Sequence, residues 1–415
     1  MHYQELIPHL FRTEFRKITT VLCKTFGVEH IEIAEDIVSD TFLLAAETWG
    51  KKGIPDQPVV WLYTVSKNKT KNYLKRNQLF HQKVNVEIKK QANQDEEVKI
   101  DLSDENILDS QLQMMFVICH PSIAPDAQVA MSLRILCGFG IQEIADAFLT
   151  NKETINKRLF RAKTKLRELG LKMEVPGPSE LDQRLESVLV TLYLLFNEGY
   201  YSVTKDVVLS KDLCWEAMRL NYMLVENKDT NKPSVNALLA LMCFHASRFD
   251  ARTNSKGDTI LYEEQDTSLW NQELIEKGQF YLNEAAKGTA VSRYHLEAAI
   301  AYWHTQVNNT KKKWESILQL HNQLLQLEYS PIAALNRTYA LAKVKGEAAA
   351  IMEAEKLKLT HYHLYHALLG NLYQGIDHQK ALQHFNRSLK LAKNEADRAI
   401  IRKYIKKLSG KGFNK

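Results

Sequence analysis

The sequence predicts an all-α protein, and three observations carry this prediction. Apolar residues recur at helical spacing along almost the whole 415-residue chain, whereas alternating, strand-like runs are almost absent. Glycine and proline are scarce, with 16 and 9 residues, so long stretches contain no helix breaker. The composition, 45% hydrophobic and 25% charged, is that of a folded protein. Because the chain is too long for one ordinary core, we expect two or three domains.

Four parts are expected in chain order. Residues 8–77 form a compact helical unit, and residues 78–110, with eight acids, four basic residues and few large apolar residues, form a flexible acidic linker. A second small helical unit follows at 111–172. The stretch Val175-Pro176-Gly177-Pro178 then breaks the chain, because two prolines and a glycine cannot continue a helix. Residues 180–415 form a large helical domain.

Bulk properties favour a cytoplasmic protein without a membrane span. No run of about 18 apolar residues occurs, and the N-terminus lacks the pattern of a secretory signal. The five cysteines are scattered and form no CxxC pair, which argues for reduced thiols and against a zinc or disulfide framework. No nucleophile–base pair, phosphate loop or metal constellation is visible. We therefore expect neither an enzyme nor a bound cofactor or metal.

A basic helix is predicted over residues 60–76. Between Lys67 and Arg76 lie five basic residues and no acid, and Lys67, Lys71 and Lys75 form one stripe. Trp61, Asn68 and Asn72 form the adjacent row. Lysines can neutralise phosphates and an aromatic face can stack an unpaired base, so this helix suits a nucleic-acid strand. The alternative is a solvated lysine-rich helix in which Trp61 is merely buried.

A helix-turn-helix is predicted in the second unit. One helix spans 127–136, a short one spans 141–149, and a third begins at Lys152 after the capping box Thr150-x-x-Glu153 and ends near 169. Six basic residues and no acid lie between 157 and 167. A helix in this position can enter a major groove. The residues expected to reach base edges are Lys152, Thr154, Asn156 and Lys157, and those expected to hold phosphates are Arg158, Arg161 and Lys163. An ordinary basic helix in a bundle remains the alternative.

These motifs together resemble the extracytoplasmic-function sigma factors of bacterial RNA polymerase. The pattern Asp36-x-x-x-Asp40-x-Phe42, followed by Trp61-Leu62-Tyr63-x-Val65-Ser66-Lys67-Asn68, is similar to their region 2, and the helix-turn-helix is similar to their region 4. The resemblance implies that region 4 reads the −35 element and that the partners are promoter DNA and core polymerase, through the β′ clamp helices and the β flap. It implies polymerase docking by Asp36, Asp40 and Phe42. It implies binding of the −10 element by Trp61, Lys67, Asn68, Lys71, Asn72, Lys75 and Arg76.

The expected linker is long enough for this function. DNA elements about 16–17 base pairs apart are separated by roughly 55 Å, and 33 residues can extend to about 110 Å. Ser39 is a departure from the pattern, because many relatives have glutamine there.

The C-terminal half contains a tetratricopeptide-like pattern. Leu369-Gly370-Asn371-Leu372-Tyr373 and the later Ala381-Leu382-x-x-Phe385 fit one repeat, and such units bury their apolar faces only by stacking. Polar groups beside apolar runs, among them His245-x-x-Arg248 and Glu263-Glu264-Gln265-Asp266, indicate either an internal network or a ligand or peptide pocket. This half resembles the fused helical extension of one sigma-factor group, which implies control of activity by an unknown protein or small-molecule signal.

Two further functions stay open. The chain could be a stand-alone helix-turn-helix transcriptional regulator with a helical sensor domain, or a repeat scaffold whose basic patches bind partners other than DNA. A regulator needs neither polymerase docking at Asp36, Asp40 and Phe42 nor a strand-stacking aromatic at Trp61. Those positions therefore separate the sigma-factor hypothesis from the regulator.

Overall fold

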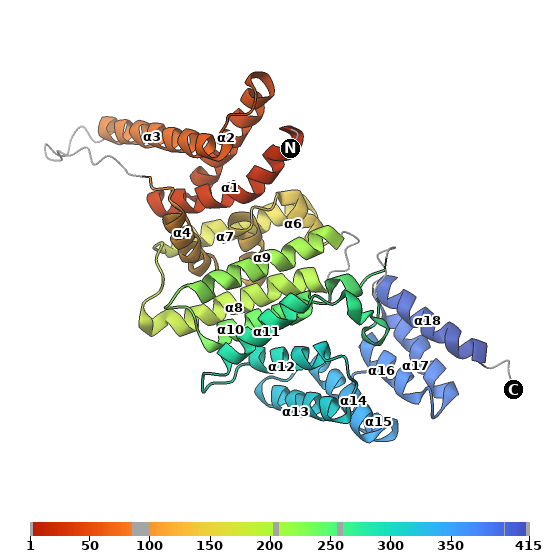
Figure 1. The fold of residues 1–415 in the computed structure, drawn as a ribbon. Helices are drawn as coiled ribbons and strands as arrows, with labels where there is room; N and C mark the ends of the chain where they lie inside the picture. Colours follow the sequence, from red (N-terminus) through yellow and green to blue (C-terminus); the bar gives the residue numbers. More distant parts are fainter. Residues whose placement is uncertain (1–2, 85–99, 202–206, 255–259, 394, 412–415) are drawn as a thin grey trace. The chain divides into compact units, whose positions relative to one another are not determined.

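The computed structural model describes residues 3–84, 100–201, 207–254, 260–393 and 395–411. Over these ranges the protein is all-α and contains no β-strand, so the predicted fold class is confirmed (Figure 1). Its internal contacts divide it into two compact units, Met1–Gly199 (unit 1) and Tyr200–Lys415 (unit 2). Each unit is described by itself.

Unit 1 contains both expected small modules and the first helix after the Pro-Gly-Pro break. Its elements are α1 (Tyr3–Phe26), the 3-10 turn η1 (Val28–His30), α2 (Ile31–Lys52), α3 (Pro58–Val84), α4 (Asp104–Ile118), α5 (Pro125–Met131), the π-helical turn η2 (Ser132–Leu136), α6 (Ile141–Ala147), α7 (Lys152–Leu169) and α8 (Pro178–Tyr200). The helix expected over 127–136 therefore ends in a π-helical turn.

The core of unit 1 is organised around α1. This helix contacts α2 and α3 from the first expected module and α4 and η2 from the second. Phe15, Ile18 and Leu22 on its buried face are fully inaccessible. Since apolar side chains from both modules cover the same helix, residues 8–77 and 111–172 share one core in this structure.

The expected linker is helical at both ends. The backbone of α3 continues to Val84, and α4 already begins at Asp104. Ser103 caps α4 by accepting a hydrogen bond from the backbone N–H of Asn106, and Asp104 and Glu105 place negative charge at the N-terminal end of the helix dipole. The middle of the expected linker, residues 85–99, lies outside the described residues.

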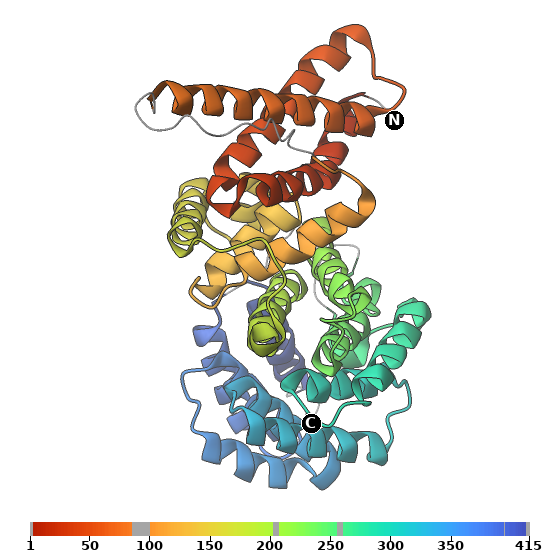
Figure 2. The same cartoon turned by 90° about the vertical axis from the view of Figure 1, so that its left-hand side faces the viewer.

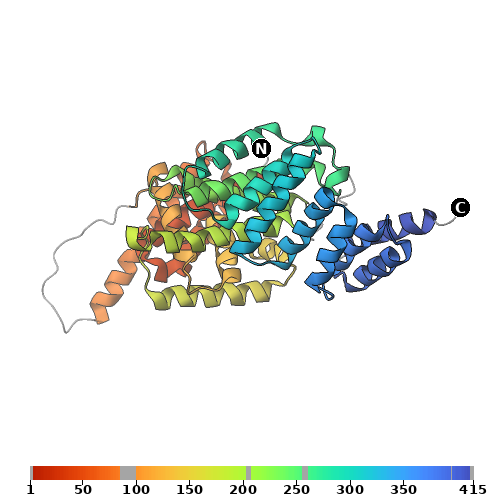
Figure 3. The same ribbon diagram turned by 90° about the horizontal axis from the view of Figure 1, so that it is seen from below.

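Unit 2 is a succession of helices. Its elements are α9 (Val207–Glu226), α10 (Pro233–Ala246), the 3-10 turns η3 (Phe249–Ala251), η4 (Tyr262–Glu264) and η5 (Thr267–Leu269), α11 (Gln272–Ala285), α12 (Arg293–Thr305), α13 (Lys311–Leu327), α14 (Pro331–Lys345), α15 (Glu347–Leu357), α16 (His363–Tyr373), α17 (His378–Leu391) and α18 (Glu395–Lys411). From α11 onward each helix contacts the next, and Figures 2 and 3 show the later members, in cyan to blue, lying against one another.

Two packing arrangements hold unit 2 together. The helix α10 is apolar around almost its whole circumference and is buried by α9, α11 and α12. Farther along, α16 and α17 pack so closely that a Cβ added to Gly370 would lie 2.9 Å from the ring of Phe385. Glycine is thus needed at the position where the sequence pattern placed it. The two helices of the predicted repeat, α16 and α17, are in close contact.

Candidate nucleic-acid interface

The first turns of α7 are presented to solvent. The side chains of Lys152, Thr154, Asn156 and Lys157 are all exposed. Asn151 caps the helix, because its Oδ1 accepts a hydrogen bond of 2.8 Å from the backbone N–H of Thr154. The capping box expected from Thr150 and Glu153 is therefore replaced by a cap one residue later. The four residues expected to reach base edges share the free end of one helix.

The opposite face of α7 is anchored in the core. Ile155, Leu159, Ala162 and Leu166 are buried, as the apolar stripe predicted. Before α6, Gly138 adopts a φ of +75°, and a Cβ there would lie 2.5 Å from the backbone oxygen of Arg12 in α1. Glycine is thus required for the turn to approach α1.

The residues expected to hold phosphates differ in their exposure and in their partners. Arg161 is exposed. Arg158 lies 3.5 Å from a carboxylate oxygen of Asp126 and above the ring of Phe148. Lys163 forms an ion pair with Glu35 of α2, and its side chain is only 14% exposed. The structure therefore leaves Arg161 open to a ligand and engages the other two within the chain.

The helix α3 carries a second polar face. Asn68, Asn72, Lys75 and Arg76 are exposed, whereas Lys67 and Lys71 are half-buried. Leu62 and Ser66 on the inner face are fully buried, and the Ser66 hydroxyl donates to Thr41 Oγ1 at 3.2 Å. The two asparagines and the cations Lys75 and Arg76 are thus accessible. The other side of the helix is packed in the core.

The environment of Trp61 agrees in part with both interpretations of this helix, because its ring is packed on a neighbour and is also partly accessible. Its ring meets that of Trp49 edge to face, with centroids 5.4 Å apart, and its side chain is half-buried. Trp49 itself is 3% exposed. The inner ring of the pair fixes the outer one, while part of the Trp61 surface stays accessible.

The predicted docking residues on α2 separate into exposed and buried groups. Asp36 and Asp40 are exposed, and Lys69 of α3 lies 3.6 Å from a carboxylate oxygen of Asp40. Phe42 is 4% exposed and packs edge to face on Phe11 of α1. The structure therefore moves Phe42 from the expected docking surface into the core, because its apolar ring fills space between α1 and α2. It can act on docking only by positioning α2.

The acidic side of α2 contacts the basic side of α7. The Glu35 carboxylate accepts a hydrogen bond of 2.9 Å from Arg134 Nε and another from Lys163 Nζ, and its side chain is 8% exposed. Nearer the surface, Arg167 Nη2 donates to Glu32 at 2.8 Å. A crevice of about 270 Å³ opens beside these pairs, and its lining includes Asp36 and Asn156. Asp36, expected to dock, and Asn156, expected to reach a base edge, thus border the same space.

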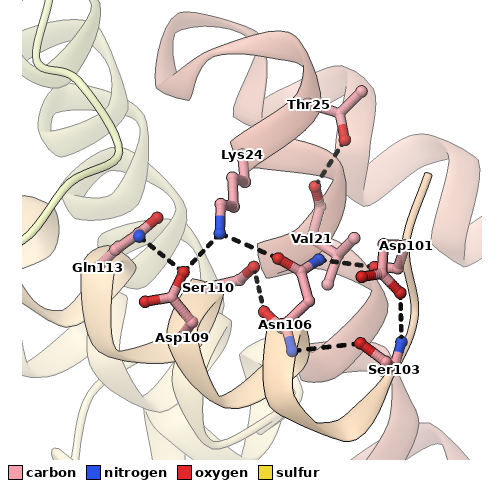
Figure 4. A network of polar contacts seen from close by, with 9 residues as sticks. All are labelled: Val21, Lys24, Thr25, Asp101, Ser103, Asn106, Asp109, Ser110 and Gln113. Carbon is pink, nitrogen blue, oxygen red and sulfur yellow. Dashed lines mark hydrogen bonds and ion pairs between the residues drawn. The ribbon is translucent and has the colours of Figure 1, made fainter. Parts of the chain in front are cut away.

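A second polar contact joins α1 to α4, whose first turns fall in the expected linker. Lys24 Nζ donates to Asn106 Oδ1 at 2.9 Å and to Asp109 Oδ2 at 2.5 Å, and Gln113 donates to the same carboxylate oxygen at 2.8 Å (Figure 4). Arg12 of α1 likewise pairs with Glu143 of α6. Ion pairs as well as the shared core therefore join the helices of unit 1.

The sequence did not indicate Glu35 or Arg134 as functional residues. Glu35 belongs to a helix whose acidic residues indicate a solvated face. Its partners Arg134 and Lys163 lie 99 and 128 residues away in the sequence. Arg134 falls in the π-helical turn, a local feature that often marks a functional position but has no sequence signature. Only the fold brings the three charges together.

The helices define an all-α protein in which an exposed basic helix end and an exposed amide-bearing helix belong to one unit. Over 395 residues the chain is 30% identical to uncharacterized protein R00370 of Rhizobium meliloti (strain 1021), covering 92% of this chain and 91% of the relative. The chain belongs to the family of that protein. Residues 184–286 also match a family of unknown function, DUF6596. No solved structure matches.

Three further properties bear on the site. None of the described helices is long and apolar enough to cross a membrane. All five cysteines are buried and free. Within the described ranges, no group of three or more His, Cys, Asp or Glu side chains could hold a metal ion.

Proposed function

We propose that the chain is a sigma factor of the extracytoplasmic-function type, which binds core RNA polymerase and directs promoter-specific initiation. The observation that carries the proposal is the pair of separate polar faces in unit 1. One is the free end of α7, with Lys152, Asn156 and Lys157 exposed, and the other is the exposed row of α3 with Asn68 and Asn72. Cations and amides suit phosphates and base edges.

The α7 face suits duplex DNA. Its exposed first turns carry two lysines, a threonine and an asparagine, and its remaining length is anchored by a buried stripe. A helix held in this way can enter a major groove with its N-terminal residues at base edges. We assign it to the −35 element.

The α3 face suits an unpaired strand. Exposed amides lie beside Lys75 and Arg76, and the partly accessible ring of Trp61 is fixed by Trp49. Base stacking on an aromatic ring contributes about 1–3 kcal/mol per base and tolerates any sequence. We assign this face to the −10 element.

The proposal requires unit 1 to open. The two promoter elements lie roughly 55 Å apart along DNA, whereas Glu35 of α2 and Lys163 of α7 are in contact. The structure described above is, on this proposal, the closed form. Opening frees Lys163 for a phosphate and uncovers the crevice beside Asp36. We further propose that unit 2 controls activity.

Binding to core polymerase separates this function from a stand-alone DNA-binding regulator. The purified chain should co-elute with core polymerase in gel filtration. Asp36→Lys should abolish co-elution because Asp36 is an exposed acid on α2, whereas Asp182→Lys, at an exposed acid on α8, should leave it unchanged. A chain that binds promoter DNA but never core polymerase would be a regulator.

A further inference from the structure

Two buried cations lie against one tyrosine in unit 2. Arg248 follows α10 and is 8% exposed, and Lys313 of α13 is 2% exposed. The guanidinium carbon of Arg248 and Nζ of Lys313 lie 5.3 Å and 5.4 Å from the ring centroid of Tyr262 in η4. Lys313 Nζ also donates to Tyr262 Oη at 2.9 Å and to the backbone oxygen of Gln306 at 2.7 Å. The cluster therefore concentrates positive charge around Tyr262.

No carboxylate balances this charge among the residues that the structure describes: neither Arg248 nor Lys313 forms an ion pair there. The two acids of η4 are engaged elsewhere. Glu263 accepts from Tyr339 at 2.6 Å and from Lys343 at 2.7 Å, and Glu264 pairs with Lys403. Arg248 Nη2 donates to Tyr200 Oη at 3.2 Å, so both cations have neutral hydrogen-bond acceptors. Burying a charge without a counter-charge is costly, so what the described residues do not supply is a balancing anion.

The histidines beside the cluster add no further charge. Burial, followed by the charges of Arg248 and Lys313, lowers the pKa of His304 to about 3. Burial and Arg248 also lower the pKa of His245 well below its ordinary value. Both rings are neutral at physiological pH. They line the cluster as polar aromatic groups.

Three nitrogens around Tyr262 also lack a hydrogen-bond partner within the described part of the chain: Arg248 Nε, Trp270 Nε1 and His304 Nδ1. Trp270 is 5% exposed and its ring stacks on Tyr262 with centroids 6.4 Å apart, while the His304 ring meets Tyr262 edge to face at 5.0 Å. The first two are donors, and Nδ1 is a donor in one neutral tautomer. Buried donors without acceptors call for an explanation.

We propose that this cluster is a binding site for a small oxyanion, a carboxylate or phosphate group of a metabolite, held by Arg248 and Lys313 beside Tyr262. Such a group supplies both the missing negative charge and acceptors for the unused donors. An arginine guanidinium matches the planar fork of a carboxylate or phosphate. The ring of Tyr262, on which Trp270 stacks, lies beside both cations. A small molecule is favoured over a protein partner because the two cations are almost inaccessible from outside.

The site goes beyond the proposed sigma-factor function and does not depend on it. Arg248, Tyr262 and Trp270 lie inside the stretch 184–286 that matches the family of unknown function. Arg248 also belongs to the motif His245-x-x-Arg248, for which promoter binding has no use. A metabolite bound here would act on unit 2.

Thermal unfolding of the full chain tests the site with inorganic phosphate and with succinate, each titrated against sodium chloride of equal ionic strength. At least one of the two anions should raise the unfolding midpoint by several degrees in a saturable way. The anion that raises the unfolding midpoint shows whether the site binds a phosphate or a carboxylate group. If neither anion acts, or if chloride acts equally, the proposal is overturned.

Lys313→Met makes the test specific. Removing an unbalanced buried charge should raise the midpoint of the free protein and abolish the response to the anion. Lys277→Met, at an exposed lysine paired with Glu273, is the matched control and should keep the full response. An unchanged anion response in Lys313→Met would overturn the proposal. So would a lowered midpoint of the free protein without any anion response, which would mean that the chain itself balances the lysine.

Discussion

Glu35 of α2 is bonded to Lys163 of α7, and this contact joins the helix expected to dock on polymerase to the helix expected to read DNA. The same carboxylate also binds Arg134, so one buried acid balances two cations. Lys163, expected from the sequence to hold a phosphate, is therefore engaged by α2 in this arrangement. Glu35 is 8% exposed in these pairs, whereas the Glu32–Arg167 pair nearer the surface is 44% and 46% exposed.

Glu35→Gln should destabilise the protein by about 3–5 kcal/mol, because it leaves two largely buried cations without their counter-charge. Urea unfolding measures the change. Glu32→Gln removes an exposed pair with Arg167 and should cost about 0–1 kcal/mol. Equal effects of the two substitutions would show that the Glu35 carboxylate does not stabilise the two buried cations.

Lys157→Ala should weaken binding to promoter DNA, and the slope of log K against log salt concentration should fall in magnitude by about 1. The reason is that Lys157, an exposed lysine near the N-terminus of α7, neutralises one phosphate on this proposal. Titrations at several salt concentrations measure the slope. Lys165→Ala, at a lysine on the same helix paired with Glu168, is the control. A slope that falls equally in both would place the DNA elsewhere on α7.

Trp61→Ala should impair strand opening more than duplex binding, because stacking on the exposed part of the ring is available only to an unpaired base. Permanganate reactivity of unpaired thymines reports opening, and a mobility shift reports binding. Trp61→Phe keeps an aromatic ring against Trp49 and should retain most of the opening. If both steps fall together in Trp61→Ala, the ring serves only the core.

Removal of residues 200–415 should change transcription output from a promoter that the full chain recognises. The cut follows unit 1 and leaves α8 with it, because Arg184 donates to the backbone oxygen of Phe116 and Thr191 donates to Gln128. Output from the two chains is compared at equal concentration. Identical output would contradict control by unit 2.

Lys313 should make stability depend on pH. Burial, and then the charge of Arg248, lower its pKa from 10.5 to about 8. Below about pH 8 both folded and unfolded chains carry the proton, and the cost of the buried charge is present in full. Between about pH 8 and 10.5 the folded chain loses the proton first, so the free energy of unfolding should rise with pH.

The difference between the wild type and Lys313→Met isolates this contribution from other groups that titrate in the same range. The groups facing Lys313 are Arg248, Tyr262 and His304, and the variant retains all three. Urea unfolding at a series of pH values measures the difference. Parallel curves from pH 7 to 11 would mean that the lysine is not desolvated.

Local patterns predicted local structure well. The apolar stripe of α7 is buried at Ile155, Leu159 and Leu166, and Gly370 lies where close packing on Phe385 demands it. The cap of α7 moved by one residue, because Thr150 and Asn151 are both acceptable caps and only the backbone geometry selects between them. Local sequence patterns therefore predict helix ends and buried faces to within about one residue.

Long-range pairing was not predictable. Phe42 belongs to the motif expected on the polymerase-docking surface. It is nevertheless buried, because Phe11 of α1 packs against it. Glu35 reads as one more exposed acid until α7 brings Lys163 beside it. The sequence distance between such partners exceeds any helical period, so no local pattern encodes it.

Run-off transcription with purified core polymerase is the most direct test of the sigma-factor proposal. The full chain added to core polymerase should produce a transcript with a defined start at a specific promoter, and Lys157→Ala should reduce that transcript. Core polymerase that starts equally well at the same position without the chain would contradict the proposal.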